Sequence, residues 1–327
     1  MPLDAWYVTA EGAEPQVAAD LPTLLARTDG FLWVDVPTWD DEAGRLLTPL
    51  LDLHPVAVET LARRNYLPSA FPYPSHVLLV VLGVLRAAEG HVHLLECDVF
   101  LAERCLVTVH GPLNPMVPVE AAEREVVSAL RRIHEGRFRP AGPADVLQDL
   151  LAGLGRHHAE VMSAVAADVA QLEQRVRDGD LRDPEPLMDE MFLLRHELQV
   201  VLTVAAHTQE LMSYVAQTQQ GTALRTQALE LAAQFGAVRR SGESERDYLA
   251  GVIDLYQTRV STKMTVAAER LAVLAALTLP VTAVSSVLGM NVIVNSHTRP
   301  VQLAVLLVAM LAISGVLLRW TKNQGWW

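Results

Sequence analysis

The sequence predicts an α+β cytoplasmic domain, a small mixed sheet with helices, followed by long helices and two C-terminal transmembrane helices. Strand-like alternation is confined to the first 110 residues, apolar side chains recur at helical spacing from about Val119, and two long uncharged stretches lie near the C-terminus. These changes of pattern predict six segments, which are 1–118, 119–269, 270–290, 291–299, 300–319 and 320–327.

The overall composition excludes several classes of protein. Of 327 residues, 51% are hydrophobic and 20% are charged, and the formal net charge is −12. Such an acidic chain lacks the excess of bases that neutralises phosphates, so we expect no nucleic-acid partner. Two cysteines exclude a disulfide scaffold. Met1–Asp4 form neither a basic nor an apolar leader, so we expect no cleaved signal peptide.

The first segment, 1–118, combines strand and helix patterns. Residues 31–36 alternate like a strand and stop before Pro37, while proline at the start of 55–63 is typical of a first helical turn. The predicted strands are 31–36, 77–85 and 91–110, the last divided by a turn, and the predicted helices are 40–52 and 55–63.

The chain from Val119 onward is helical by its apolar spacing. Nine positions recur at mostly three- and four-residue steps and predict a seam for helix packing that is close to a coiled coil. A second helix is expected over 186–217 and a third from Thr222. The third can run unbroken into the first uncharged stretch, because neither Pro nor Gly lies between Gly251 and Pro280. The seam consists of Leu147, Leu151, Leu154, His158, Val161, Val165, Val169, Leu172 and Val176.

Two uncharged stretches near the C-terminus are each long enough to cross a membrane. Twenty residues over 271–290 and eighteen over 301–318 carry no charge. About twenty residues at ~1.5 Å each span a hydrocarbon core of ~30 Å, so the two stretches predict a transmembrane hairpin. The alternative is a buried helical hairpin in a soluble core, although soluble helices of this length normally carry a charged face.

Basic residues predict the orientation of this hairpin. They flank both stretches on the side of the N-terminal region, whereas the linking segment 291–299 holds only Arg299. We therefore expect a multi-pass protein of the inner or plasma membrane with both termini in the cytoplasm. The flanking bases are Arg259, Lys263, Arg270, Arg319 and Lys322.

The first stretch ends in the triplet Gly289-Met290-Asn291. Here the chain resembles the CorA family of divalent-cation channels, whose signature is a Gly-Met-Asn at the end of the first of two C-terminal spans. The resemblance covers essentially the whole chain. Further similar pieces are 53–59, 99–101, 107–110, 253–256, 260–263 and 279–282.

The resemblance implies a funnel-shaped homopentamer in membrane lipid that passes divalent cations down the membrane potential. Mg²⁺ is the expected cation, with Co²⁺ and Ni²⁺ as further cargo, and the resemblance implies neither an enzyme nor a resident cofactor. It assigns the selectivity filter to Gly289, Met290 and Asn291. A ring of Asn291 amide oxygens can bind the hydration shell of Mg²⁺, which gives up water reluctantly. A helix C-cap is the alternative for Asn291.

The resemblance also assigns pore-lining positions to one face of the first span. These positions recur at three- or four-residue steps and none is charged, so they can line a narrow pore, with Leu271 and Leu279 as hydrophobic constrictions. Plain helix packing by small residues is the alternative. Asn291 does not fall on this face by helical period, so we expect the helix to distort or end at Gly289. The positions are Thr282, Leu279, Ala275, Leu271, Ala268, Thr265 and Ser261.

Regulation by cytoplasmic Mg²⁺ is also implied by the resemblance, through metal that bridges subunits. Ungapped counting from the filter places Glu230 at a metal-sensing position. The acidic residues over 178–190 are accounted for as a solvated helix tip and need no metal site to explain them.

The loop 292–299 departs from the family, because it has no acidic residue and contains His297. A zinc transporter of the ZntB type, coupled to protons, is therefore an alternative, and a membrane-anchored metal sensor is another.

A separate zinc site is a weaker interpretation of the first segment. His91, His93 and Cys97 lie at even spacing on one expected strand and can share a face. A structural zinc site needs a fourth ligand at a recognisable spacing, and a half-buried strand accounts for these residues better. The sequence contains no nucleotide-binding loop, so we do not expect an ATP-driven pump.

Overall fold

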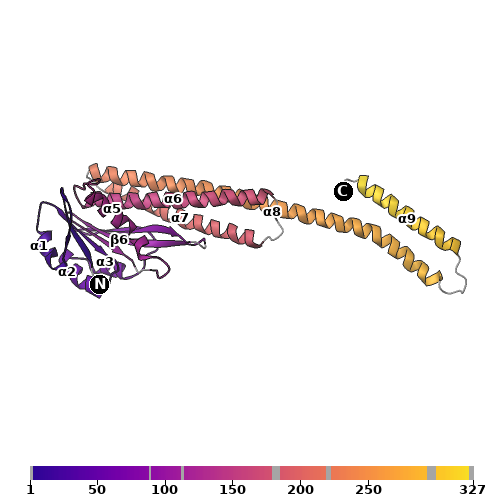
Figure 1. Ribbon diagram of the computed structural model, residues 1–327, viewed down its shortest axis with the longest axis horizontal. Coiled ribbons are helices and arrows are strands. Elements are labelled where there is room, and N and C mark those ends of the chain that lie inside the picture. Colours follow the sequence, from indigo (N-terminus) through magenta and orange to yellow (C-terminus); the bar gives the residue numbers. More distant parts are fainter. Residues whose placement is uncertain are drawn as a thin grey trace. The chain divides into compact units, whose positions relative to one another are not determined.

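The computed structural model describes residues 3–87, 90–111, 114–178, 185–218, 222–292 and 300–323. It consists of two compact units, one up to Val252 and the other from Ile253 onward. The first unit holds a sheet and the long helices that pack on it, and the second holds the end of one long helix and the C-terminal helix (Figure 1).

The first unit is built on a seven-stranded mixed sheet with the order β2-β1-β3-β7-β6-β5-β4. Among these strands, β3 and β7 pair in parallel and the other neighbours are antiparallel. The strands predicted over 31–36, 77–85 and 91–110 are confirmed. The seven are β1 (Asp4–Thr9), β2 (Gly12–Gln16), β3 (Phe31–Val36), β4 (Ser69–Pro72), β5 (Val77–Arg86), β6 (Val92–Ala102) and β7 (Cys105–His110).

Three strands, β1, β2 and β4, are missing from the sequence-based prediction. β2 and β4 are the two edges of the sheet, and they contain Pro15 and Pro72. An edge strand leaves one row of backbone groups without a ladder partner, so it tolerates proline, which has no N–H to donate. In a sequence, a proline argues against a central strand, and this hid both edges. Each edge depends on its neighbour in the sheet more than on its own residues.

One face of the sheet is covered by α1 (Leu21–Leu25), α2 (Asp41–Leu51) and α3 (Pro55–Ala62), with a short 3-10 turn at Ala18–Asp20 before them. The helices predicted over 40–52 and 55–63 are confirmed. α2 begins where the Asp40 carboxylate accepts two backbone N–H groups of the first turn, at 3.0 and 2.8 Å. It ends where Asp52 adopts a left-handed conformation with φ of 49°.

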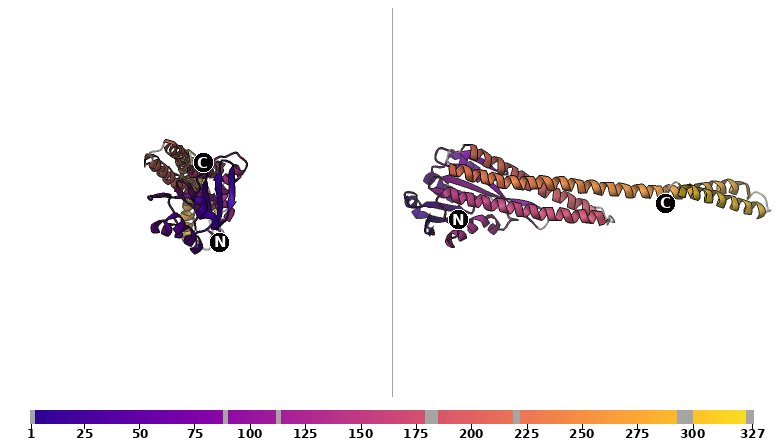
Figure 2. Two further views of the ribbon diagram at one scale, coloured as in Figure 1. Left: turned by 90° about the vertical axis from the view of Figure 1, so that its left-hand side faces the viewer. Right: turned by 90° about the horizontal axis from the view of Figure 1, so that it is seen from above.

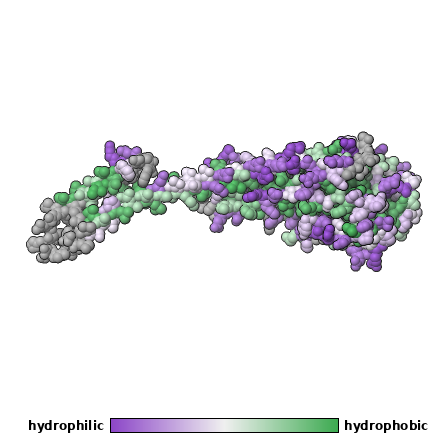
Figure 3. Space-filling model, turned by 180° about the vertical axis from the view of Figure 1, so that it is seen from behind, coloured by the Kyte–Doolittle hydropathy of each residue, from purple (hydrophilic) through white to green (hydrophobic). Residues whose placement is uncertain are grey.

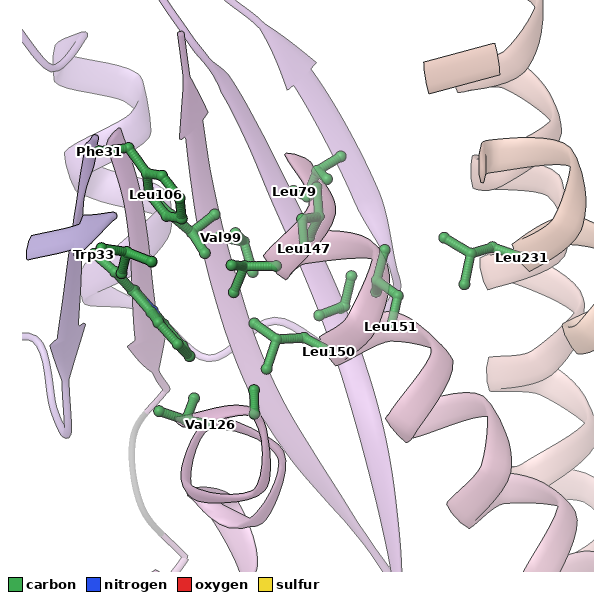
Figure 4. Packing of buried hydrophobic residues seen from close by; sticks show 14 of the residues in the cluster. Phe31, Trp33, Leu79, Val99, Leu106, Val126, Leu147, Leu150, Leu151 and Leu231 are labelled. Atoms are coloured by element: carbon green, nitrogen blue, oxygen red, sulfur yellow. The ribbon is translucent and has the colours of Figure 1, made fainter. Parts of the chain in front are cut away.

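The opposite face is covered by α5 (Arg124–His134) and α6 (Pro143–Asp178), after the short α4 (Val119–Ala122). Figure 4 shows Trp33, Val99 and Leu106 pointing from the strands toward Val126 of α5 and Leu150 of α6. The central strands are therefore buried on both faces, which explains why β3 and β7 are buried along their whole length.

Three long helices, α6, α7 (Glu185–Thr218) and the first part of α8 (Thr222–Val292), lie side by side (Figure 2). Every residue of the predicted seam on α6 is buried or half-buried. The predicted helix over 186–217 and the unbroken run of the third helix past Pro280 are both confirmed.

Arg86, at the end of β5, ties the sheet to two of these helices. Its Nε donates to the Glu197 carboxylate of α7 at 3.0 and 3.2 Å, and its guanidinium also pairs with Asp168 of α6. The Glu197 side chain is buried. Burial raises the pKa of Glu197, and the hydrogen bond from Arg86 opposes that shift. The ion pair therefore stabilises the ionised form of a buried carboxylate.

His158 lies fully buried in the helix bundle, with its ring 5.5 Å from the Phe235 ring. Its Nδ1 donates to the Leu154 carbonyl oxygen at 2.7 Å, and its Nε2 has no hydrogen-bond partner among the described residues. Burial lowers the pKa of His158 to about 4. The imidazole is therefore neutral at physiological pH.

Asp98 is a buried titratable group of the sheet, as His158 is of the helix bundle. It is fully buried in β6, on the face that also carries Phe100, and neither carboxylate oxygen meets a hydrogen-bond partner in the described part of the chain. Burial, with a smaller contribution from the Glu96 carboxylate, raises the pKa of Asp98 to about 8.

Replacing His158 by leucine is expected to flatten the acid side of the stability profile. The folded-state pKa lies below 6.5, the ordinary pKa of histidine, so the full stability is present above that pH and is lost as the pH falls toward 4. The loss at pH 4 is on the order of 3 kcal/mol. Chemical denaturation between about pH 7 and 4.5 measures it. His134→Leu is the matched control, because exposed His134 makes the same bond to the carbonyl four residues earlier, at 2.8 Å. Equal slopes in the two variants would contradict the assignment.

Replacing Asp98 by asparagine is expected to remove a loss of folding stability that occurs as the pH rises toward about 8. The folded-state pKa of Asp98 lies above 3.8, the ordinary pKa of aspartate, so the full stability is present below that pH and is lost as the pH rises to about 8. Asp98→Asn keeps the shape and cannot ionise, so its stability relative to the parent should rise from pH 5 to pH 8 and then level off. Denaturation midpoints measure it, with the exposed Asp189→Asn as control. A constant difference across this range would show that Asp98 is not protonated in the fold.

Candidate functional site

The most apolar part of α8 has no fully buried residue among those that the structure describes. Among the described residues, one helix is long and apolar enough to cross a membrane, between Leu224 and Ser286, and a shorter apolar stretch lies at Val308–Leu317 of α9 (Pro300–Asn323). None of the most apolar window of α8 is buried. A core helix of a soluble protein would be covered, so the buried-hairpin alternative does not account for this surface. Figure 3 shows the hydrophobic side chains there in green.

Within the second unit, α9 covers one side of α8. Positions over 273–284 that are half-covered recur at three- and four-residue steps, and α9 runs back beside α8 (Figure 1). Ser285 and Met310 meet between the two helices, with 4.0 Å from Oγ to Sδ. The half-covered residues are Val273, Ala276, Leu277, Pro280, Val281 and Val284.

The seven expected pore-lining positions form an exposed stripe on α8. All seven are exposed, and Leu271 and Leu279 are exposed by 67% and 66%. At about 3.6 residues per turn this stripe and the half-covered face lie on roughly opposite sides of the helix. The stripe carries no charge and is not the surface used for α9. We define it as the α8 stripe: Ser261, Thr265, Ala268, Leu271, Ala275, Leu279 and Thr282.

The threonines of the α8 stripe bond to their own helix. Thr265 Oγ1 donates to the Ser261 carbonyl oxygen at 3.0 Å, and Thr282 Oγ1 donates to the Thr278 carbonyl oxygen at 2.8 Å. The hydroxyl hydrogen of each is thereby used, and the oxygen lone pairs are left to accept hydrogen bonds from outside the helix. The stripe therefore offers acceptors and apolar surface.

The expected filter residues lie in the last turn of α8, which continues to Val292. The expectation that the helix distorts or ends at Gly289 is therefore wrong for this single chain. The backbone hydrogen bonds hold the helix through Asn291, and regular helical spacing places Asn291 off the α8 stripe. The side chains of 289–291 and the whole of 293–299, including His297, lie outside the described residues.

The basic residues occur where the hairpin prediction needs them. Lys263 and Arg270 precede the most apolar part of α8, and Arg319 and Lys322 end α9; all four are exposed. Because α9 runs back beside α8, both groups lie at the same end of the second unit. This is the arrangement expected for a hairpin whose basic end faces the cytoplasm.

Glu230 lies exposed on the first part of α8. Its carboxylate accepts a hydrogen bond from Gln148 Nε2 of α6 at 3.3 Å. The described residues bring together no group of three His, Cys, Asp or Glu side chains that could hold a metal. Within the described residues, Glu230 is therefore not part of a metal cluster. Part of the acidic segment, 179–184, lies outside the described residues.

The same finding bears on the zinc interpretation of His91, His93 and Cys97. These residues do not converge into a three-ligand site in the described structure. His93 Nδ1 lies 3.4 Å from Asn114 Nδ2, and burial raises the pKa of the Cys97 thiol well above its usual value. Burial also raises the pKa of Cys105, to about 12. Both are therefore thiols in half-buried or buried strands.

Sequence reasoning missed a polar cluster inside the sheet. The Asp35 carboxylate accepts hydrogen bonds from the Thr108 hydroxyl and from His110 Nε2, the latter at 3.1 Å, and all three side chains are buried. Trp33 Nε1 donates to Thr108 Oγ1 at 3.3 Å. The available signal was the presence of polar residues within two apolar predicted strands. Asp35 lies in the first, and Thr108 and His110 alternate with valines in the second. The cluster links β3 to β7, the parallel pair of the sheet.

Comparison with known proteins identifies the family. The sequence model described as CorA-like Mg²⁺ transporter protein matches residues 28–322. No protein with a curated function matches the chain. The complete CorA magnesium transporter of Methanocaldococcus jannaschii has a similar fold, with a TM-score of 0.81 at 14% identity over 100% of this chain and 99% of that one.

Two further solved structures share the fold. Full-length CmaX matches with a TM-score of 0.74 at 16% identity, over 99% of this chain and 97% of CmaX. The cytoplasmic domain of ZntB from Vibrio parahaemolyticus matches with a TM-score of 0.58 at 13% identity, over 79% of this chain and 98% of that domain. The family match spans most of the chain, both units included, and this chain belongs to the CorA-like Mg²⁺ transporter family.

Proposed function

We propose that this chain is one subunit of a passive Mg²⁺ channel in the inner or plasma membrane, driven by the membrane potential and gated by cytoplasmic metal, with both termini in the cytoplasm. Mg²⁺ is the cargo, and Co²⁺ and Ni²⁺ are further cargo. The first span is 270–290, the loop 291–299 lies outside, and the second span is 300–319. The magnesium transporter of M. jannaschii, which shares the fold, supports the choice of cation.

The α8 stripe carries this proposal. Its seven positions are uncharged and exposed, and they lie opposite the face that α9 half-covers. A chain with two spans cannot enclose an aqueous path by itself, so identical stripes from several subunits must face one another. The proposed assembly is a funnel-shaped homopentamer, with the α8 stripes inside and α9 outside.

The chemistry of the stripe suits a hydrated divalent cation. Mg²⁺ prefers oxygen ligands and keeps its water, and the water of a hydrated cation presents hydrogens outward. Ser261, Thr265 and Thr282 offer oxygen acceptors to those hydrogens. Leu271 and Leu279 form apolar rings that close the path by dewetting. A double charge that crosses ~100 mV gains about 4–5 kcal/mol, so uptake needs no ATP.

The proposed filter is Gly289, Met290 and Asn291, with Asn291 as a metal ligand through the hydration shell. In the single chain the last turn of α8 is helical. The proposal therefore requires that this turn open at Gly289 when subunits assemble, so that Asn291 amide oxygens and backbone carbonyls face the axis. Glycine is the residue type that permits such a change of backbone.

Closure is proposed to follow from Mg²⁺ bound between neighbouring subunits, with Glu230 as one ligand. Glu230 is exposed and therefore available to a second chain. Metal that bridges subunits stabilises the closed state, and its loss releases α8.

Zinc transport of the ZntB type, coupled to protons, is the second candidate. The fold similarity to the ZntB cytoplasmic domain and the acid-free loop with His297 favour it. The Gly-Met-Asn triplet favours magnesium.

Replacing Asn291 by alanine is expected to abolish Mg²⁺ uptake and to leave the oligomer intact, because the change removes only the amide oxygens of the filter. Uptake into proteoliposomes under a potassium diffusion potential measures the flux, and native mass spectrometry counts the subunits.

The same proteoliposomes separate the candidates. Voltage-driven Mg²⁺ flux that the Asn291→Ala variant loses supports the channel. Zn²⁺ flux that rises with an inward proton gradient moves the protein to the zinc transporter, and undiminished Mg²⁺ flux in the variant would falsify the filter assignment. Metal-dependent conformational change without flux would instead favour a sensor.

Replacing Leu279 by serine is expected to raise Mg²⁺ flux at high cytoplasmic Mg²⁺, because a hydroxyl wets the apolar ring that closes the path. Leu274→Ser is the matched control, since Leu274 is exposed by 58% but lies off the α8 stripe. The same uptake assay measures both variants. Equal effects of the two substitutions would contradict the orientation of α8.

A further inference from the structure

A pocket of ≈ 330 Å³ opens between the edge of the sheet and the ends of the three long helices. Its walls come from β4, β5 and β6, from the first turns of α6, the last turns of α7 and the first turns of α8. Leu79, Leu147 and Leu231 line it and also belong to the main core cluster, so the pocket interrupts a core that is otherwise filled. Figure 4 shows Leu231 pointing across from α8 toward Leu147 and Leu151 of α6.

Small side chains keep this pocket open. Ala70 of β4, Ala144 of α6 and Ala228 of α8 line three different walls. Ala228 is 4% exposed, so a longer side chain at this position would extend into the pocket and not into solvent. The volume is about twice that of the ~150 Å³ apolar cavity that binds benzene in an engineered protein. An aromatic ring with a short substituent fits this space.

The lining is apolar and carries no carboxylate, guanidinium, ammonium or imidazole among the described residues. Moving a charged ligand into such a site would cost its hydration without a compensating partner. Metal ions, phosphates and nucleotides are therefore excluded as occupants. Pockets of this size with few polar groups are typical sites for small uncharged molecules.

Two glutamine amides contribute polar groups to the lining, beside the phenol of Tyr214. Gln148 Nε2 donates to the Glu230 carboxylate at 3.3 Å, and Gln227 Nε2 donates to the Asp145 carboxylate at 3.0 Å. Each amide is thereby fixed by its nitrogen to a carboxylate on the facing helix, α6 or α8. Its carbonyl oxygen remains an acceptor at the pocket. A ligand that donates a hydrogen bond, such as a hydroxyl, complements this arrangement.

We propose that this pocket binds a small uncharged amphiphile, an aryl or alkyl group that carries one hydroxyl. The apolar part lies against Leu79, Leu147 and Leu231, and the hydroxyl donates to the amide oxygen of Gln148 or Gln227. The proposed binding does not require that the chain conduct ions, and the occupant contacts the first turns of α8 directly.

The experiment uses the full chain in lipid nanodiscs, because detergent is itself an amphiphile. The probe is 4-(trifluoromethyl)phenol, observed by ¹⁹F NMR, with empty nanodiscs as the blank for partition into lipid. We expect a saturable shift beyond the blank. The matched probe 4-(trifluoromethyl)toluene lacks the hydroxyl and should bind roughly five- to tenfold more weakly, as expected for one lost hydrogen bond.

Four variants locate the site. Ala228→Leu and, independently, Ala144→Leu fill the pocket and should remove the saturable signal. Ala233→Leu makes the same change on α8 at an exposed position outside the lining and should leave the affinity unchanged. Gln227→Leu should weaken the phenol and spare the toluene.

Two results would overturn the proposal. One is a probe signal in the full chain that equals the blank. The other is an affinity that is the same in the parent and in both filled variants. Equal binding of the phenol and the toluene would overturn the role of the hydroxyl.

Discussion

Helix α8 has to satisfy two different surroundings with one uninterrupted run of backbone hydrogen bonds. In hydrocarbon every backbone N–H and C=O must be satisfied within the protein, and a helix does this by itself. In the first unit the same helix contributes Leu231 and Phe235 to a packed core. Tyr256 is the last residue of α8 that is buried within the described chain. Beyond it, among the residues whose burial is described, α9 half-covers one side of the helix and the opposite side is exposed.

The two faces of α8 have different surroundings in the second unit. One side is half-covered by α9, and the opposite side, the α8 stripe, is uncharged and bare. A bare stripe that is uncharged but supplied with hydroxyl oxygens is unsuited to lipid alone, because the oxygens would lack partners there. Both water and apolar rings have a place along it. The proposed conduction path uses both kinds of position, the hydroxyl oxygens as acceptors for the hydrated cation and the leucines as apolar rings.

Much of this architecture could be predicted from local signals. Asp40 and Pro55 mark helix starts, and the absence of breakers before Pro280 predicted the continuous α8. Edge strands β2 and β4 could not be predicted, since their pairing depends on neighbours distant in the sequence. The burial of Asp98 likewise follows from packing, as nothing local distinguishes it from a solvated residue, whereas the helical spacing placed His158 in the buried seam. At the site, the resemblance to the family assigned the seven stripe positions, but the sequence did not predict that the helix of the single chain continues through Asn291.

The main core cluster also sets the order of events during synthesis. It starts with Val8 and is completed by Leu231 and Ala232, so this cluster stays incomplete until the first turns of α8 have been made. The first uncharged stretch begins at Leu271, only about 40 residues later. At ~5–20 residues per second the ribosome needs roughly 2–8 s for that distance. Closure of the first unit and delivery of the first span to the membrane thus compete for the same few seconds, and a substitution that slows closure presents the insertion machinery with an unfinished domain.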